Sequence, residues 1–204
     1  MSTDEPISVE AHLQTAIAPR FGQIVAATAK QLDALQRDLA DLRAARGSIE
    51  WQVDGEGGGT WFLNIADGAM TIAPAAIEPP FMSVAQSAEN WRRFVSGAAT
   101  PGFLGGGSSR RGLGKQRIER LRTIRGSVRF VVTGMPDGGE WSFVTRFGPG
   151  PFPEESQTRV TLAAAVMQQL QGEAINPQLA FMQGQVRIAG DTALAMQLGM
   201  ALFL

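Results

Sequence analysis

The residue types that most often carry chemistry are scarce in this chain. It has no cysteine, which excludes disulfides, thiolate metal ligands and cysteine nucleophiles. Its single histidine, His12, lies in a weakly patterned N-terminal segment and cannot alone build a multi-histidine metal site. No Ser/His/Asp set and no characteristic pair of carboxylates can be recognised, and acids such as Asp67, Asp137 and Asp191 have the positions of turn and capping residues. We therefore expect no catalytic residue, no metal and no cofactor.

A glycine-rich stretch, GGGSSRRGLGK at Gly105–Lys115, has the composition of a phosphate-binding loop. That loop requires Gly-x4-Gly-Lys followed by Ser or Thr, and the first glycine position is here Ser109. Gln116 follows the lysine, and no predicted strand leads into the segment. The pattern is more typical of a flexible linker than of a nucleotide site.

A basic stretch follows, with seven Lys and Arg residues and one Glu between Arg110 and Arg125. Ile118, Leu121 and Ile124 would form its inner stripe as a helix. A basic amphipathic helix can make transient contact with an anionic membrane surface. A solvated helix face is the other interpretation. Aromatic residues are not interleaved with the charges, so we expect no nucleic acid partner.

The elements that would position these residues start after a weakly patterned arm, residues 1–20. Residues 21–46 predict a helix, because apolar residues recur every three or four positions and Gly47 follows. That stripe consists of Val25, Thr28, Leu32, Leu35, Leu39 and Leu42. Residues 48–53 and 60–65 predict a hairpin across a glycine turn, and residues 69–73 and 81–86 predict two more strands. Ser87 is placed to cap a short helix.

The second half of the chain repeats this plan. LRAARGSIEWQV, which begins at Leu42, matches LRTIRGSVRFVV, which begins at Leu121. The offset of about 80 residues predicts a diverged tandem duplication. The predicted domains are an incomplete first half at 21–97, a Gly/Ser-rich linker at 98–114 and a second half at 115–204.

The C-terminal segment, INPQLAFMQGQVRIAGDTALAMQLGMALFL, predicts a helix, a strand and a final helix. Asn176 can cap the first helix with Pro177 at its first position, and Asp191 can cap the last. The strand alternates, with Val186 and Ile188 on one side. The last helix is apolar around its whole circumference, which requires apolar partners on more than one side.

This segment resembles the C-terminal signature of the sterol carrier protein two family, an Asn-Pro-x-x-Ala-Phe-Met-x-Gly helix followed by a strand, Gly-Asp and a closing helix. The matching positions are Asn176, Pro177, Ala180, Phe181, Met182, Gly184, Ile188, Gly190 and Asp191. The resemblance implies an α+β fold in which helices cover a five-stranded sheet. It also implies a hydrophobic tunnel, closed in part by the last helix, that binds fatty acyl chains, sterols or other lipids.

On that resemblance we expect an apolar ligand to be bound and carried without chemistry. The predicted tunnel lining is Leu179, Phe181, Met182, Val186, Ile188, Met196, Met200 and Phe203. Two alternatives stay open. One is an enzyme or enzyme-accessory protein that acts on an apolar substrate in the same cavity, and the other is a structural module whose apolar tail forms a homodimer interface.

The chain also departs from the family. The first half lacks a counterpart of the Phe-Met-x-Gly helix and of the closing strand and helix. In the second half, RFGPGPFPEESQ replaces a regular third strand. The first half is therefore expected to be a lid, an additional sheet or a partner surface.

The bulk composition excludes some classes of protein. Hydrophobic residues make up 44% and charged residues 18%, which is ordinary for a globular protein. A net charge of −1 gives no global attraction to nucleic acid or membrane. The acidic N-terminus lacks the pattern of a signal peptide, and no apolar run reaches the ~18 residues of a membrane span. We expect a cytoplasmic location.

Overall fold

The computed structural model describes residues 8–95, 112–135, 138–172 and 174–203. The predicted linker at 98–114 lies almost wholly outside these residues. Two compact units are present, Met1–Ala40 and Asp41–Leu204. Among the described residues, no helix is both long enough and apolar enough to cross a membrane.

The N-terminal unit is helical. A short helix α1 (Val9–His12) and a π-helical turn η1 (Leu13–Ile17) lead into α2 (Ala18–Arg43), which extends through its last residues into the second unit. The helix predicted from the apolar spacing is confirmed, and it ends at Arg43, ahead of Gly47. None of the 26 residues of α2 is buried, and among the described residues five members of its apolar face, Phe21, Val25, Leu32, Leu35 and Leu39, are 46–72% exposed.

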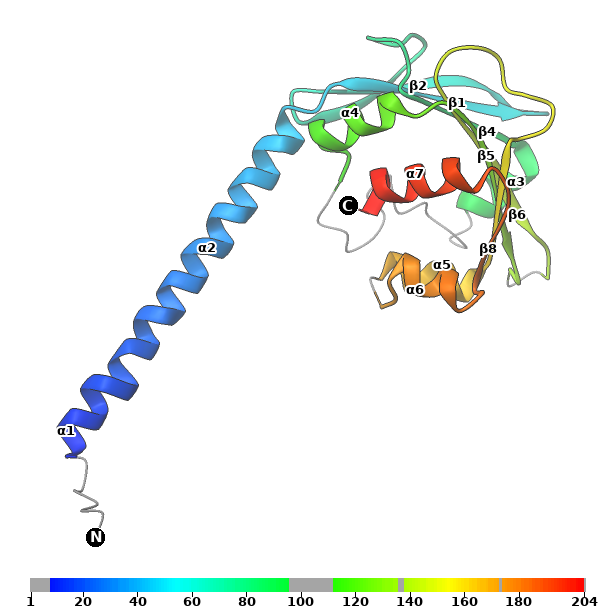
Figure 1. Ribbon diagram of the computed structural model, residues 1–204. Coiled ribbons are helices and arrows are strands. Elements are labelled where there is room, and N and C mark those ends of the chain that lie inside the picture. Colours follow the sequence, from blue (N-terminus) through cyan, green and yellow to red (C-terminus); the bar gives the residue numbers. More distant parts are fainter. Residues whose placement is uncertain (1–7, 96–111, 136–137, 173, 204) are drawn as a thin grey trace. The chain divides into compact units, whose positions relative to one another are not determined.

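The second unit contains one eight-stranded sheet with the order β3-β2-β1-β4-β6-β5-β7-β8 (Figure 1). Every strand predicted in the first half is present, with ends that differ from the prediction by no more than one residue. The strands are β1 (Gly47–Asp54), β2 (Gly59–Ala66), β3 (Ala69–Ala73), β4 (Met82–Ser87), β5 (Gly126–Thr133), β6 (Trp141–Phe147), β7 (Thr158–Ala163) and β8 (Val186–Gly190).

The two halves of the sequence share this sheet. β4 pairs antiparallel with β6, in the register Ser83↔Arg146, and so joins β1–β3 to β5–β8. Within each half the first strand pairs antiparallel with the next and parallel with a later one: β1 with β2 and β4, β5 with β6 and β7. This common pairing is what a duplication would produce, although the duplication itself stays an interpretation.

A serine contact is also common to both halves. The Ser48 hydroxyl accepts a hydrogen bond from the Ile77 backbone N–H at 3.1 Å, in the segment that leads into β4. The Ser127 hydroxyl accepts one from the Gln157 N–H, also at 3.1 Å, just before β7. In both halves the Arg-Gly-Ser sequence therefore anchors the chain where it returns to the parallel strand.

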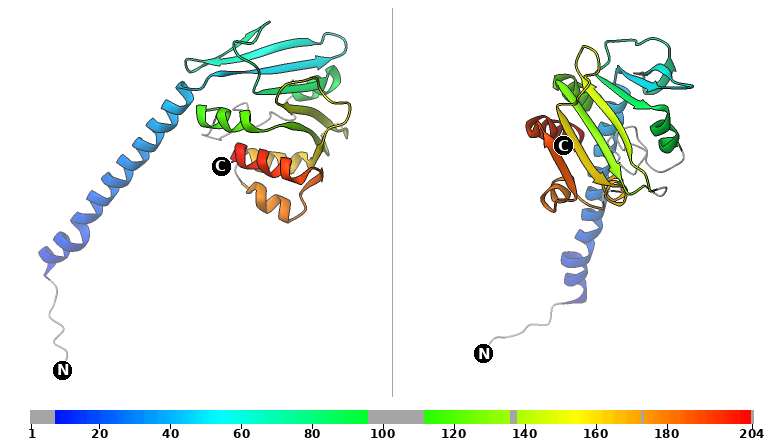
Figure 2. Two further views of the ribbon diagram at one scale, coloured as in Figure 1. Left: turned by 45° about the horizontal axis from the view of Figure 1, so that its top comes forward. Right: turned by 90° about the vertical axis from the view of Figure 1, so that its right-hand side faces the viewer.

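Five helices complete an α+β fold. They are α3 (Ala88–Arg93), α4 (Lys115–Thr123), α5 (Ala164–Gln171), α6 (Pro177–Met182) and α7 (Thr192–Phe203). Helices α4, α5, α6 and α7 lie on the same side of the curved sheet (Figure 2). The core forms where alternate strand residues meet these helices, for example Val128 and Val132 of β5 and Trp141 of β6, each no more than 1% exposed.

The tryptophans divide into two pairs. Trp51 and Trp141 are buried in the core. Trp61 and Trp91 are 39% and 37% exposed. Trp61 lies on β2, next to the edge strand β3, whose Ile72 is 73% exposed. This end of the sheet is therefore less covered than its centre.

A polar cluster fixes the join between the halves on the face of the sheet opposite the core. Arg146 of β6 donates to Ser83 of β4 at 2.6 Å and forms an ion pair with Glu50 of β1 at 3.1 Å. The Ser83 hydroxyl donates to the same Glu50 carboxylate at 2.6 Å. The guanidinium of Arg146 also lies over the ring of Phe152. Neighbouring strands from both halves are thus linked through Glu50, Ser83 and Arg146.

Candidate functional site

The basic helix α4 forms as predicted, and it packs on the core. Ile118, Leu121 and Ile124 are all at most 3% exposed, which confirms the predicted inner stripe. The neighbouring α7 contacts this helix. Arg110 and Arg111, at the start of the basic stretch, lie outside the described residues.

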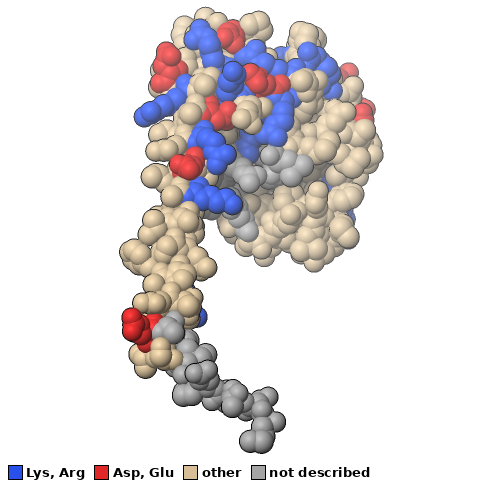
Figure 3. All heavy atoms as spheres, turned by 60° about the vertical axis from the view of Figure 1, so that its left-hand side comes forward, with Lys and Arg blue, Asp and Glu red and all other residues tan. Residues whose placement is uncertain are grey.

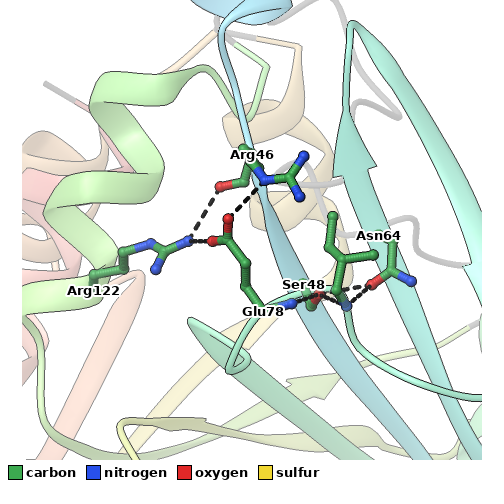
Figure 4. Close-up of polar contacts among 6 residues, drawn as sticks. Arg46, Ser48, Asn64, Glu78 and Arg122 are labelled. Atoms are coloured by element: carbon green, nitrogen blue, oxygen red, sulfur yellow. Dashed lines mark hydrogen bonds and ion pairs between the residues drawn. The ribbon is translucent and has the colours of Figure 1, made fainter.

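Several cations of α4 are engaged within the protein. Arg122 donates to the Glu78 carboxylate at 2.5 Å and to the Arg46 carbonyl at 3.2 Å, and Arg46 binds the other oxygen of Glu78 at 2.8 Å (Figure 4). Arg117 is buried and donates to the Gly112 carbonyl. These pairs reduce the positive charge that α4 can offer to an anionic surface. Contact of Arg110–Arg125 with a membrane stays a prediction.

Glu78 links the first half of the chain to α4. Hydrogen bonds from Arg122, and then from Arg46, hold its pKa below the ordinary value for a glutamate, against the opposing effect of burial. Its backbone neighbour Ile77 donates to both Ser48 and Asn64. These interactions hold the segment before β4 in place, and the role of the cluster is therefore structural.

The final helix α7 presents two apolar faces, as its composition predicts. Leu194, Leu198 and Ala201 are each 4% exposed and belong to the core. Met196 and Met200 lie on the other face and are 62% and 53% exposed. The predicted cap is also present, because the Leu194 N–H donates to the Asp191 carboxylate at 3.0 Å.

Helix α6 is apolar and largely exposed. Its predicted start is confirmed by a 2.8 Å hydrogen bond from the Gln178 N–H to the Asn176 side chain. Ala180 is completely buried, whereas the large side chains Leu179, Phe181 and Met182 are exposed by 45%, 50% and 81%. The helix is thus anchored by a small residue while its largest side chains face solvent.

The remaining residues of the predicted lining lie on β8 and at the end of α7. Val186 and Ile188 on β8 are half-buried, while Arg187 between them is exposed, as the predicted alternation requires. They pair with Leu162 and Val160 of β7. Phe203 is the last residue of α7, and its side chain is not described.

Helix α5 adds residues that were not predicted. Val166, Met167 and Leu170 are half-buried and pack against the core. Their spacing of one and three is the helical signal that would have identified them.

We refer to the exposed side chains of Leu179, Phe181, Met182, Met196 and Met200 as the apolar surface of α6 and α7.

No charge interrupts the helices that carry this surface. The segments α5, α6 and α7 contain no Asp, Glu, Lys or Arg. In Figure 3 charged side chains gather on the upper part of the second unit, while its lower part, where Figure 1 places α5 and α6, is tan on the face in view. Large exposed apolar groups on uncharged helices are typical of a surface that something apolar covers.

The described residues include one hollow with polar lining residues, beside α4. Within the described part of the chain, no group of three or more His, Asp or Glu side chains is placed to hold a metal ion. A shallow hollow of about 420 Å³ lies against α4, and it is lined by Gln116, Glu119, Arg120 and Thr123. It is wide open and two of its four lining residues are charged, so it is a poor match for an acyl chain.

A protein-family model matches this half of the chain. Residues 110–203 match the SCP-2 sterol transfer family, so the chain contains a domain of the sterol carrier protein 2 type. The match includes α4 to α7 and β5 to β8, and with them the whole apolar surface of α6 and α7. It covers just under half of the chain. No curated protein matches the sequence.

Solved structures of sterol carrier proteins are also similar to this chain. Apo sterol carrier protein 2 from Yarrowia lipolytica is 21% identical over 43% of this chain and 74% of its own, with a TM-score of 0.34. Palmitated sterol carrier protein 2-like 2 from Aedes aegypti is 17% identical over 44% and 93%, also with a TM-score of 0.34. These TM-scores are low, and the assignment of the domain rests on the family model.

Proposed function

We propose that the second half of this chain binds a long-chain acyl lipid, a sterol or a similar apolar molecule against α6, β8 and α7, and carries it without chemical change. The observation that carries the proposal is the apolar surface of α6 and α7. Five large apolar side chains stay 45–81% exposed there, on helices without a single charge, within the segment that matches the family model.

The energetics of burial support a ligand of this kind. Full burial of a large apolar side chain is worth about 1.5–3 kcal/mol, so covering the exposed parts of five contributes on the order of 4–9 kcal/mol. An acyl chain of ~16 methylenes adds about 0.8 kcal/mol for each methylene it removes from water. Both values are gross gains, and the cost of ordering the ligand is subtracted from them.

The composition of the surface suits a ligand of variable shape. Met182, Met196 and Met200 are unbranched, and their thioethers are polarisable, so they can adapt to ligands of different outline. Val186 and Ile188 on β8 would form the floor beneath them, and Phe203 would close the end of α7. An enclosed tunnel, lined by these six residues together with Leu179 and Phe181, is the arrangement that we propose for the bound form.

The test is a titration of the full chain with a fluorescent C16 fatty acid. Met196→Gln and Met200→Gln preserve side-chain length but add a polar amide, so each is expected to weaken binding about tenfold, which corresponds to ~1.4 kcal/mol. Met70→Gln is the matched control, because Met70 is 46% exposed on the distant strand β3. Equal affinity in all three variants would contradict the proposed site.

A fold control accompanies that titration. Because both α7 methionines are exposed, their replacement is expected to change the free energy of unfolding by no more than about 0.5 kcal/mol. A large loss of stability would instead identify them as core residues. In that case the weaker binding would be a secondary effect of unfolding.

A further inference from the structure

Helix α2 carries a sustained seven-residue repeat of apolar positions. From Phe21 to Leu42 the stripe advances by four and three residues in strict alternation, which is a mean spacing of 3.5. A stripe on an ordinary surface helix follows 3.6, whereas 3.5 is the spacing of a coiled coil. In heptad notation the a positions are Ala18, Val25, Leu32 and Leu39, and the d positions are Phe21, Thr28, Leu35 and Leu42.

These positions are exposed to solvent in the single chain. Phe21, Val25, Leu32, Leu35 and Leu39 are between 46% and 72% exposed, and none of the 26 residues of the helix is buried. Most of the stability of a protein helix comes from packing of its apolar face. A helix of this length with most of its stripe exposed therefore requires a partner.

The charges on α2 are arranged as in a coiled coil. Arg20, Lys30, Asp33, Arg37 and Asp41 occupy the b, c and f positions, which point away from a partner helix. The residues that flank the stripe closer to the N-terminus, at e and g, are uncharged: Gly22, Ile24, Ala29, Gln31 and Gln36. Nothing charged would therefore be buried beside this N-terminal part of the stripe.

The remaining flanking charges indicate the partner and its orientation. Asp38 is at g and Arg43 at the following e position, and both are exposed. In a parallel in-register pair, a g residue lies beside the e residue five positions later on the other helix. Asp38 of each chain would then face Arg43 of the other, and Gln31 would face Gln36.

We propose that α2 forms a parallel, two-stranded coiled coil with α2 of a second copy of this chain. The partner that covers the stripe is thus an identical helix. The complementary charges of Asp38 and Arg43 favour this pairing. Thr28 is the one polar residue at an inner position, and in register it faces itself, where a polar pair opposes a shifted alignment. This proposal does not depend on lipid binding by the second half.

Cysteine cross-linking tests it directly, because the chain has no cysteine of its own. Thr28→Cys and Leu39→Cys are each expected to form an intermolecular disulfide on mild oxidation, since in a parallel register every inner residue faces its own copy. Lys30→Cys, at an outward f position, is the matched control and should stay uncross-linked. In an antiparallel pair only one of the two inner positions can face itself, so cross-linking of only one would overturn the proposal.

Solution mass supplies the second measurement. Light scattering should give twice the mass of one chain for the full-length protein and for Ala34→Asp, which adds a charge at an outward c position. Leu35→Asp should give the mass of one chain, because the same charge would be buried in the interface. Asp38→Arg should weaken the dimer, and adding Arg43→Asp should restore it. A full-length chain that stays monomeric up to its solubility limit overturns the proposal.

Discussion

At the scale of single residues, the clearest interactions are structural. Glu78 receives hydrogen bonds from Arg122 and Arg46 and joins the segment before β4 to α4. Its pKa is lowered in the folded chain, so folding favours its ionised form. The stabilisation it provides is complete above the pKa of an unfolded glutamate, about 4.3, and is lost as the pH falls through the lower folded value.

Because folding lowers the pKa of Glu78, the contribution of this residue to stability should depend on pH. Glu78→Gln is expected to reduce the free energy of unfolding by about 1 kcal/mol at pH 7, a typical value for partly exposed ion pairs that form a small network. As the pH falls through the lowered pKa of Glu78 in the folded chain, the difference from the unmodified chain should shrink, because Glu78 then becomes protonated in the folded state as well. Urea unfolding of the variant and of the unmodified chain, at neutral and at acidic pH, measures this difference in the free energy of unfolding.

Glu56→Gln serves as the control, since Glu56 is an exposed turn residue between β1 and β2. It should have no effect at either pH. A constant deficit for Glu78→Gln from neutral to acidic pH would contradict an ionic role and indicate lost packing instead.

Local signals in the sequence predicted several residues correctly. The caps Asn176 and Asp191 and the alternation around Arg187 depend on neighbours within four positions, and the structure confirms them. The faces of α7 could not be distinguished in the same way. That helix is apolar all round, so only its tertiary position determines that Leu194 is buried and Met196 exposed.

At the scale of elements, β4 has the position of the strand that the second half lacks. Beside β6, β5, β7 and β8 it gives five consecutive strands, which is the size of sheet that the family resemblance implies. The segment RFGPGPFPEESQ, in contrast, forms no strand after its first residues. The first half thus contributes a strand to the second, which the sequence could not predict, because the pairing joins residues about 60 positions apart without a local signal.

This arrangement predicts how a shortened chain behaves. A fragment of residues 112–204 would leave the β6 edge open and would also lose the Glu50–Ser83–Arg146 cluster. Open strand edges promote association, so the fragment should aggregate or form mixed oligomers. A fragment of residues 41–204 keeps β4 and should stay well dispersed.

Size-exclusion chromatography of the two fragments at equal concentration is the measurement. A monomeric 112–204 fragment with the melting temperature of the 41–204 fragment would contradict the account. The second half would then be an independent domain, and the pairing of β4 with β6 would contribute little to its stability.

At the scale of the whole molecule, the chain combines a helical unit with a sheet unit, and different features suggest a role for each. The sterol-carrier-type domain has exposed apolar side chains on uncharged helices, which supports a small apolar ligand. Helix α2 has exposed apolar side chains in heptad spacing, which supports a second chain. The predicted halves, at 21–97 and 115–204, describe a proposed repeat in the sequence. They are not separate domains in space, since one sheet contains strands from both.

The central claim is that this chain carries an apolar ligand on its second half. The most direct measurement is native mass spectrometry of the gently purified full-length protein, followed by organic extraction and by incubation of the stripped protein with palmitate. We expect one lipid per chain after purification and one palmitate per chain after reloading, with occupancy reduced in Met196→Gln and unchanged in Met70→Gln. A chain that emerges empty and takes up no palmitate, or that loads equally well in both variants, would contradict the account.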